Sequence, residues 1–247
     1  MTAQDIVKSF AFISLERAEL LIKYNDLVME KNKVMNLTGI KDLQESVILL
    51  YIISDEILKN MIKNIYDSLT VYDKKYFPEQ GRILDLGTGA GFPGVVLAIL
   101  RPDMQVVLMD AIRKKLSFIQ EAVELLCLRN VEVVHSRAED AAIQPVYRDA
   151  FDVVTARAVK SLPVISEWAL PFVKKGGFFA AMKGPGAETE LGESQSILHC
   201  MHASVDAVKE LTLPSGEQRA ILYIKKNGVT PTRFPRKAGE AERHPIK

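Results

Sequence analysis

The spacing of apolar residues divides the chain into two parts near residue 80. In the first part, two groups of apolar residues recur at steps of three and four: Leu20, Tyr24, Leu27 and Val28, then Ile53, Ile57, Met61 and Ile65. This spacing is typical of amphipathic helices, whose apolar stripes need a partner surface. The stretch Asn36-Leu37-Thr38-Gly39 interrupts the pattern and indicates a turn. We therefore expect residues 1–80 to form an N-terminal helical cap, which either only covers the following domain or also shapes a substrate cleft.

From residue 81 onward, short apolar runs alternate with segments of helix length. The predicted strands are residues 82–87, 105–110, 131–135, 151–156 and 177–183, with weaker candidates at 204–212 and 220–225. Strands that alternate with helices predict a mostly parallel sheet with helices on both faces. Residues 81–226 are therefore predicted to form one α/β domain with a seven-stranded, Rossmann-like sheet, followed by a tail over residues 227–247.

A glycine-rich turn follows the first predicted strand. It contains Asp85, Gly87, Gly89, Gly91, Phe92, Pro93 and Gly94, and the apolar run from Val95 to Leu100 has the length of a helix start. Glycine is needed where the backbone takes a positive φ or passes close to a ligand, and proline suits the first turn of a helix. The order of strand, tight turn and helix is typical of a site for a nucleotide-like ligand.

The carboxylate of Asp85 decides between two ligand classes for this turn. Gly89, Gly91 and Gly94 satisfy the dinucleotide pattern G-x-G-x-x-G, in which a pyrophosphate lies on the helix N-terminus. However, Asp85 precedes the first glycine, where a carboxylate would repel pyrophosphate and attract the ammonium group of an amino-acid moiety. This favours S-adenosylmethionine over a dinucleotide, and a purely structural glycine turn is the remaining alternative.

Residues after the next two strands fit the same ligand. Asp110 ends the second predicted strand, 23 residues after Gly87, where a carboxylate can accept both ribose hydroxyls; a helix cap is the alternative. After the third strand, Ala138 and Glu139 are placed to frame an adenine. Ser136 with Glu139 also matches a helix capping box, and both interpretations are compatible.

Two basic residues, Arg157 and Lys183, end the fourth and fifth predicted strands. Strand ends at this edge line the cleft in such sheets, so two cations there suit an anionic substrate. Two roles stay open for them: to clamp a phosphate of the substrate, or to pair with the carboxylate of the cofactor.

The basic charge of the chain is concentrated at its end. The 247 residues are 48% hydrophobic and 26% charged, with formal net charge +1, which is typical of a globular chain and argues against a polybasic nucleic-acid binder as a whole. From Lys225 to Lys247, seven basic residues face two acidic ones, a local balance of +5. Prolines in this segment disfavour a continuous helix or central strand. A basic, extended arm predicts phosphate contacts, with a disordered solubilising tail as the alternative. The candidate RNA contacts in it are Arg233, Arg236, Lys237 and Arg243.

Other features of the sequence narrow the class of protein. The two cysteines, Cys127 and Cys200, indicate no disulfide framework. The segment from His199 to His202 lacks the spacing of a zinc motif, so we expect no metal site. The N-terminus has no signal-peptide pattern, and the longest apolar run is too short to cross a bilayer. We therefore expect a cytoplasmic monomer with no membrane partner.

These motifs occur in the order seen in a known family. The segments are Asn36-Leu37-Thr38, Asp85 to Gly94, Arg137-Ala138-Glu139, Ala156-Arg157-Ala158, Met182-Lys183-Gly184 and Phe234 to Gly239. Over nearly the whole chain they resemble the bacterial small-subunit ribosomal RNA guanine-N7 methyltransferases, the glucose-inhibited-division B family. The resemblance implies a class I methyltransferase fold and methyl transfer from S-adenosylmethionine to N7 of one guanine in 16S ribosomal RNA, guanine 527 in the family's rRNA numbering. It also implies cofactor contacts by Gly87, Phe92, Ala138, Glu139 and Arg157.

The N-terminal part departs from the family pattern in two respects. Asn64 stands where the family usually has His before its aromatic-Tyr-Asp-Ser segment, and the interval from Asn36 to that segment is longer than usual. A substrate role of that His therefore does not carry over to this chain.

The implied reaction makes few chemical demands on the protein. Guanine N7 already carries a lone pair, so no general base is needed and positioning dominates. Two other function classes stay open. A methyltransferase acting on another RNA, a protein or a small molecule would have no use for the basic tail, and a non-catalytic S-adenosylmethionine-binding module would not need Arg157 and Lys183.

Overall fold

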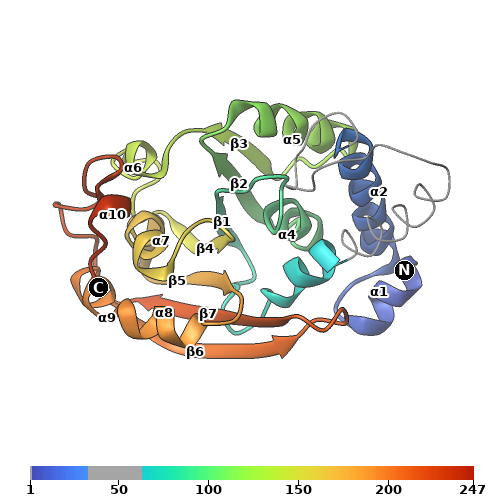
Figure 1. Ribbon diagram of the computed structural model, residues 1–247. Coiled ribbons are helices and arrows are strands. Elements are labelled where there is room, and N and C mark those ends of the chain that lie inside the picture. Colours follow the sequence, from blue (N-terminus) through green and yellow to red (C-terminus); the bar gives the residue numbers. More distant parts are fainter. Residues whose placement is uncertain (1, 33–62) are drawn as a thin grey trace, which may run out of the picture.

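A seven-stranded sheet runs through the protein in the order β3-β2-β1-β4-β5-β7-β6, seen in the computed structural model, which describes residues 2–32 and 63–247 (Figure 1). Strands β1 to β5 are parallel, and β7 pairs antiparallel with both β5 and β6. The strands are β1 Gly81–Leu86, β2 Met104–Asp110, β3 Val131–His135, β4 Phe151–Arg157, β5 Val173–Lys183, β6 Ala203–Thr212 and β7 Gln218–Lys226. The predicted Rossmann-like, mostly parallel sheet is confirmed. Only β5 begins clearly earlier than predicted, at Val173.

Helices cover both faces of the sheet. On one face lie α1 (Ala3–Ser9), α2 (Leu15–Asn32), α4 (Gly94–Leu100) and α5 (Arg113–Leu125); on the other lie α6 (Ala138–Ala141), α7 (Leu162–Ala169), α8 (Ala187–Glu193) and α9 (Gln195–Cys200), as Figure 1 shows. Residues 63–70 are also helical, η1 spans Leu170–Phe172 and α10 spans Glu240–Arg243. Two hydrophobic cores result, one on each face of the sheet.

The central strands are buried on both faces, and this explains their continuous apolar runs. The last five residues of β2 and the last four of β1 are all buried. Strand β6, at the edge of the sheet, instead alternates between half-buried and exposed positions along much of its length. The weaker sequence signal of β6 therefore follows from its place at the edge.

The N-terminal helices belong to the core on the α4 side of the sheet. Of the first predicted apolar stripe, Tyr24 and Val28 are fully buried in the same cluster as α4 and α5, and Leu20 and Leu27 are partly buried against it, so this stripe is confirmed. Of the second stripe only Ile65 can be placed, and it is buried. The predicted turn at residues 36–39 and the rest of that stripe lie outside the described residues. The boundary at residue 80 stays a proposal about how the chain is organised.

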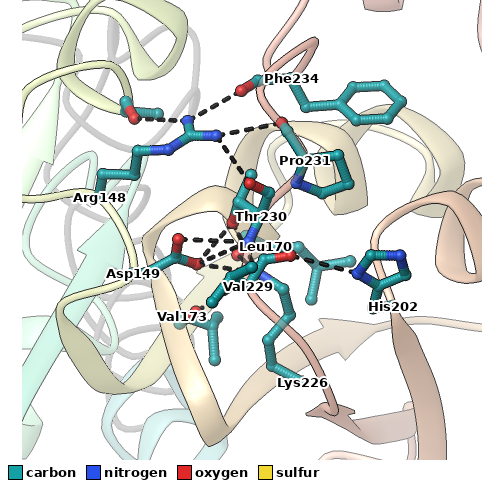
Figure 2. Close-up of polar contacts among 11 residues, drawn as sticks. Arg148, Asp149, Leu170, Val173, His202, Lys226, Val229, Thr230, Pro231 and Phe234 are labelled. Atoms are coloured by element: carbon teal, nitrogen blue, oxygen red, sulfur yellow. Dashed lines mark hydrogen bonds and ion pairs between the residues drawn. The ribbon is translucent and has the colours of Figure 1, made fainter.

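The C-terminal segment is folded against the α7 side of the sheet rather than extended away from it. Lys226, which is 0% exposed, donates to the Leu170 carbonyl at 2.8 Å and the Thr230 hydroxyl at 2.7 Å, and pairs with Asp149 at 3.2 Å (Figure 2). Arg148 donates to backbone carbonyls of the segment, including that of Phe234 at 2.8 Å. The segment is therefore neither an extended arm nor a disordered tail, because Lys226 at the end of β7 and Arg148 before β4 bond it to the domain. Its phosphate contacts stay a prediction.

We expect this polar cluster to carry a measurable share of the stability. Replacing Asp149→Asn removes the carboxylate beside the buried Lys226 while keeping a residue type that tolerates its φ of +48°. The free energy of unfolding should fall by about 1.5–3 kcal/mol, the range for hydrogen bonds to charged groups, measured by denaturant titration near neutral pH.

The pH dependence gives an internal check on this variant. Burial lowers the pKa of Lys226 below that of a lysine in the unfolded chain. The unfolded chain therefore binds more protons, and the penalty of leaving the ammonium without its carboxylate should shrink as the pH rises toward the ordinary lysine pKa. A deficit that is constant with pH would mean that Asp149 acts through its hydrogen bonds with Thr230 alone.

Candidate active site

The glycine turn lies at the carboxyl end of β1, next to the end of β2. Gly87, Gly89 and Gly91 take φ values of +70°, +60° and +84°. The amides of Gly87 and Thr88 donate to the Met109 carbonyl at 2.9 and 3.1 Å, which ties the turn to β2. A Cβ on Gly87 would lie 2.7 Å from a methyl group of Val159, so the chain has no room there for a side chain. The turn thus brings bare backbone to the edge of the sheet.

Asp85 lies behind this turn and not in an open cleft. Its side chain is 1% exposed, and its two oxygens accept from the Gly94 amide and the Thr155 hydroxyl, each at 2.9 Å. Burial raises the pKa of this carboxyl, and the hydrogen bonds from Thr155 and Gly94 oppose that shift. The carboxylate is therefore bonded to the start of α4 and to β4, and its predicted contact with a ligand ammonium stays a prediction.

Helix α2 also packs against the glycine turn. The Tyr24 hydroxyl donates to the Ala90 carbonyl, and burial raises the pKa of this phenol. The Tyr24 ring lies 5.4 Å from the ring of Phe92, which is itself buried. The Arg157 guanidinium also lies over the Phe92 ring, 5.4 Å from its centroid. Phe92 is thus a packing residue that connects α2, the turn and the end of β4.

A cavity of about 440 Å³ opens at the ends of β1, β2 and β4. Its wall includes Leu86, Gly87, Met109, Asp110, Ile112, Ala138, Glu139, Val159, Lys160, Trp168, Gly239 and Glu242. Asp110 ends β2 as predicted; its carboxylate accepts from the Gly89 amide at 3.0 Å and the Ile112 amide at 2.8 Å. The carboxylate therefore links the glycine turn to the start of α5 and lies on the cavity wall.

The lining of this cavity fits an adenine nucleoside, which has an apolar body and polar ends. Apolar side chains such as Met109, Ile112 and Val159 line it together with the acids Asp110 and Glu139. The indole Nε1 of Trp168 is buried without a hydrogen-bond acceptor among the described residues. Trp168 lies on the cavity wall, but this nitrogen is buried behind that wall.

Ser136 does not form the predicted capping box. The N-cap of α6 is Arg137, with no side-chain cap, and the Ser136 hydroxyl donates to the Arg137 carbonyl at 3.0 Å. Because α6 starts one residue later than the box requires, Glu139 is not committed to a cap. It instead accepts from the Gly239 amide at 3.2 Å, beside the cavity.

A second cavity, of about 680 Å³, adjoins the first, and the segment from Ala158 to Lys160 lines both. Among the described residues that line it, five are basic and two are acidic: Lys63, Arg157, Lys160, Lys183 and Arg219, with Asp67 and Glu190. Arg157 and Lys183 therefore lie together in this cavity, and Arg157 is not on the wall of the first. Lys183 donates to the Lys160 carbonyl at 2.6 Å and pairs with Glu190 at 2.8 Å.

Asp67 and Arg219 are features of this cavity that sequence reasoning missed. One oxygen of Asp67 pairs with Arg157 at 3.2 Å and with Arg219 at 3.4 Å. Its other oxygen is buried with no hydrogen-bond donor among the residues that the structure describes. The only signal in the sequence was the segment around Asn64 that resembles the family, and nothing there marked Arg219, which reaches the cavity from β7.

Of the four predicted RNA contacts in the tail, one is paired with a buried acid and three are exposed. Arg236 pairs with Glu167 of α7, with Nη2 at 2.6 Å and Nε at 2.9 Å from the two carboxylate oxygens. Arg233, Lys237 and Arg243 are exposed. In the described part of the chain, no three His, Cys, Asp or Glu side chains gather as metal ligands, and no helix has the length and apolar character to cross a membrane.

The sheet order, the glycine turn and the cavity beside Asp110 at the strand switch point define a Rossmann-like S-adenosylmethionine-dependent methyltransferase. Comparisons with known proteins agree. Residues 17–221 match the family described as rRNA small subunit methyltransferase G. The chain is 37% identical to "Ribosomal RNA small subunit methyltransferase G" of Leuconostoc mesenteroides over all of both chains, and 40% identical to that of Lactobacillus acidophilus over 94% of this chain and 90% of the relative.

Solved structures resemble the chain in fold. M. jannaschii TYW2 in complex with AdoMet has a TM-score of 0.53 at 14% identity, covering 66% of this chain and 76% of that one. A 16S rRNA (adenine(1408)-N(1))-methyltransferase from Catenulisporales acidiphilia has a TM-score of 0.51 at 17% identity, covering 60% and 86%. The chain belongs to the rRNA small subunit methyltransferase G family. The family resemblance and the S-adenosylmethionine prediction are thereby confirmed.

Removing the Asp110 carboxylate should weaken cofactor binding. We expect Asp110→Ala to cost about 1.5–3 kcal/mol of S-adenosylmethionine affinity in calorimetry, the range for a hydrogen bond to a charged group. Asp140→Ala, which removes an exposed carboxylate on the neighbouring helix α6, is the matched control and should bind normally. Equal affinity of the two folded variants would take Asp110 out of the cofactor site.

Proposed function

We propose that the protein transfers a methyl group from S-adenosylmethionine to N7 of one guanine in 16S ribosomal RNA, guanine 527 in the family's rRNA numbering. The observation that carries this proposal is the pair of adjoining cavities. One is built on the glycine turn and has Asp110 and Glu139 on its wall. The other has mostly basic residues among its charged ones, and the segment from Ala158 to Lys160 belongs to both. Such a pair suits a nucleoside cofactor beside an anionic polymer.

The predicted cofactor residues have different roles, on the wall of the first cavity or around it. Asp110 accepts the ribose hydroxyls, Ala138 and Glu139 frame the adenine, and Gly87 lets the backbone approach the ligand. Gly89 and Gly91 shape the turn, while Asp85 and Phe92 act from behind it. Arg157 reaches from β4 toward the boundary of the two cavities, where it suits a carboxylate or a phosphate.

The second cavity receives the target nucleotide of the RNA. Arg157, Lys183 and Arg219 present positive charge from β4, β5 and β7, and Lys63 adds a fourth cation from the helical segment 63–70. Phosphate contacts of this kind fix the position of a nucleic acid without reading its sequence. The exposed tail cations Arg233, Lys237 and Arg243 extend the same charge beyond the cavity.

The chemistry requires positioning more than proton transfer. Guanine N7 presents a lone pair, so no residue needs to create a nucleophile. The cofactor supplies an electrophilic methyl group. The protein's part is to hold the base against the wall shared by the two cavities, so that nucleophile and methyl meet in line at about 3–3.5 Å. We propose that it does so as a cytoplasmic monomer.

Mass mapping of methylated nucleotides tests this function. 16S RNA from cells with and without the protein should differ at a single guanine, which carries an N7 methyl group only when the protein is present. An unchanged 16S RNA, with a missing methyl group on another RNA, a protein or a small molecule, would overturn the substrate assignment and leave the methyltransferase class standing.

The salt dependence of RNA affinity tests the tail. If Arg233, Lys237 and Arg243 contact phosphates, replacing all three with Gln should reduce the slope of log affinity against log salt by about 0.7–0.9 per cation. The variant should therefore lose affinity mainly at low salt, while S-adenosylmethionine binding and thermal unfolding stay the same. Arg236 is left in place because it holds Glu167.

A charge-matched control separates local contacts from a general loss of positive charge. It replaces three exposed lysines elsewhere in the chain with Gln: Lys8, Lys23 and Lys175. The control should keep most of the wild-type slope. If both triple variants give the same slope as each other, the tail makes no specific phosphate contact.

A further inference from the structure

The C-terminal segment, residues 227–247, forms part of the wall of the first cavity. Gly239 and Glu242 lie on its wall together with Trp168 of α7. The Gly239 amide donates to Glu139 at 3.2 Å, and Glu242 pairs with Lys160 at 3.2 Å. The C-terminal segment therefore touches both the predicted adenine residue and the segment shared by the two cavities.

Two sets of buried contacts hold this segment in place. The first is the cluster of Arg148, Asp149 and Lys226 at its beginning (Figure 2). The second is the ion pair between Arg236 and Glu167, whose carboxylate is almost fully buried and also accepts the Arg236 amide at 3.2 Å. Arg236 further donates to the His244 carbonyl at 2.9 Å.

The second contact set is connected directly to the cavity. Glu167 precedes Trp168 in α7, and Arg236 precedes α10 in the segment, so one ion pair positions a residue on each of two cavity walls. Arg236 lies before α10 and is bonded to Glu167, and its guanidinium also donates to the His244 carbonyl after α10. It therefore fixes the short helix at both ends. Loss of this guanidinium would release the turn that carries Gly239 and Glu242.

We infer that the C-terminal segment is part of the cofactor site, with Gly239 and Glu242 forming the wall over the adenosine end of S-adenosylmethionine and Arg236 as the positioning residue. This inference rests on the proposed cofactor residues Ala138 and Glu139. It assigns the basic tail a second role besides RNA contact. Because binding at two linked sites is reciprocal, the cofactor stabilises the docked segment by the factor by which the docked segment tightens the cofactor.

Binding of S-adenosylhomocysteine tests the inference without any RNA. Trp168 is the single tryptophan of the chain and lies on the cavity wall, so its fluorescence follows the titration. Arg236→Gln should raise the Kd about 5- to 150-fold, the usual span of coupling between sites. Lys175→Gln, which removes the same charge from an exposed site, is the matched control and should bind as the wild type does.

A second variant covers the case in which Arg236→Gln disturbs the fold by leaving Glu167 buried without its partner. Glu242→Gln removes only the half-exposed pair with Lys160, and should also raise the Kd while leaving thermal unfolding unchanged. Wild-type affinity in both variants would overturn the inference. Failure of the wild type itself to bind would instead overturn the cofactor assignment on which the inference rests.

Reciprocity gives a readout that a merely structural role of Arg236 would not move. Trypsin can cut after Lys237 and Arg243 only where the segment leaves its docked position. Saturating S-adenosylhomocysteine should slow these cuts in the wild type, as followed by the mass of the released peptides, and should slow them less in Arg236→Gln. Equal cutting rates with and without the ligand in the wild type would contradict the coupling.

Discussion

The cofactor cavity depends on one buried contact, the 2.9 Å hydrogen bond from the Gly94 amide to the carboxylate of Asp85. This bond joins the end of β1 to the start of α4, and the glycine turn between them takes its shape from both. Gly94 permits the approach, since a Cβ there would lie 2.2 Å from Leu108 and 2.7 Å from the Asp85 carboxylate. A buried charge is costly unless it is hydrogen-bonded, and the Thr155 hydroxyl completes the partners that make this one tolerable.

Both ends of the chain then build on this turn. From the N-terminal side, Tyr24 of α2 contacts the Ala90 carbonyl and the ring of Phe92. From the C-terminal side, Gly239 and Glu242 reach the cavity in front of it. Segments from both ends of the chain therefore help to build the site, although the residues that face the ligand are concentrated at the ends of β1, β2 and β4. This explains why the family resemblance extends far beyond the glycine motif.

The sequence was informative where local pattern and position in the fold coincide. The strands, the glycine turn and Asp110 at the end of β2 follow from apolar runs and from spacing along the chain. What the sequence could not supply were partners distant along the chain. Nothing in the sequence around Glu167 indicates that Arg236 pairs with it. Arg219 reaches the second cavity only because β7 pairs with β5. Likewise, nothing local to Asp85 shows that its carboxylate accepts a hydrogen bond from the Gly94 amide.

The most direct test of the role of Asp85 compares two ligands in the Asp85→Asn variant. An amide offers one acceptor where the carboxylate offers two, so either Gly94 or Thr155 would face a donor, and an unmade buried hydrogen bond costs about 1–3 kcal/mol. If Asp85 shapes the turn, S-adenosylmethionine and methylthioadenosine, which lacks the amino-acid moiety, should lose affinity by the same factor in calorimetry. A loss confined to S-adenosylmethionine would place the carboxylate against the ligand ammonium and contradict this role.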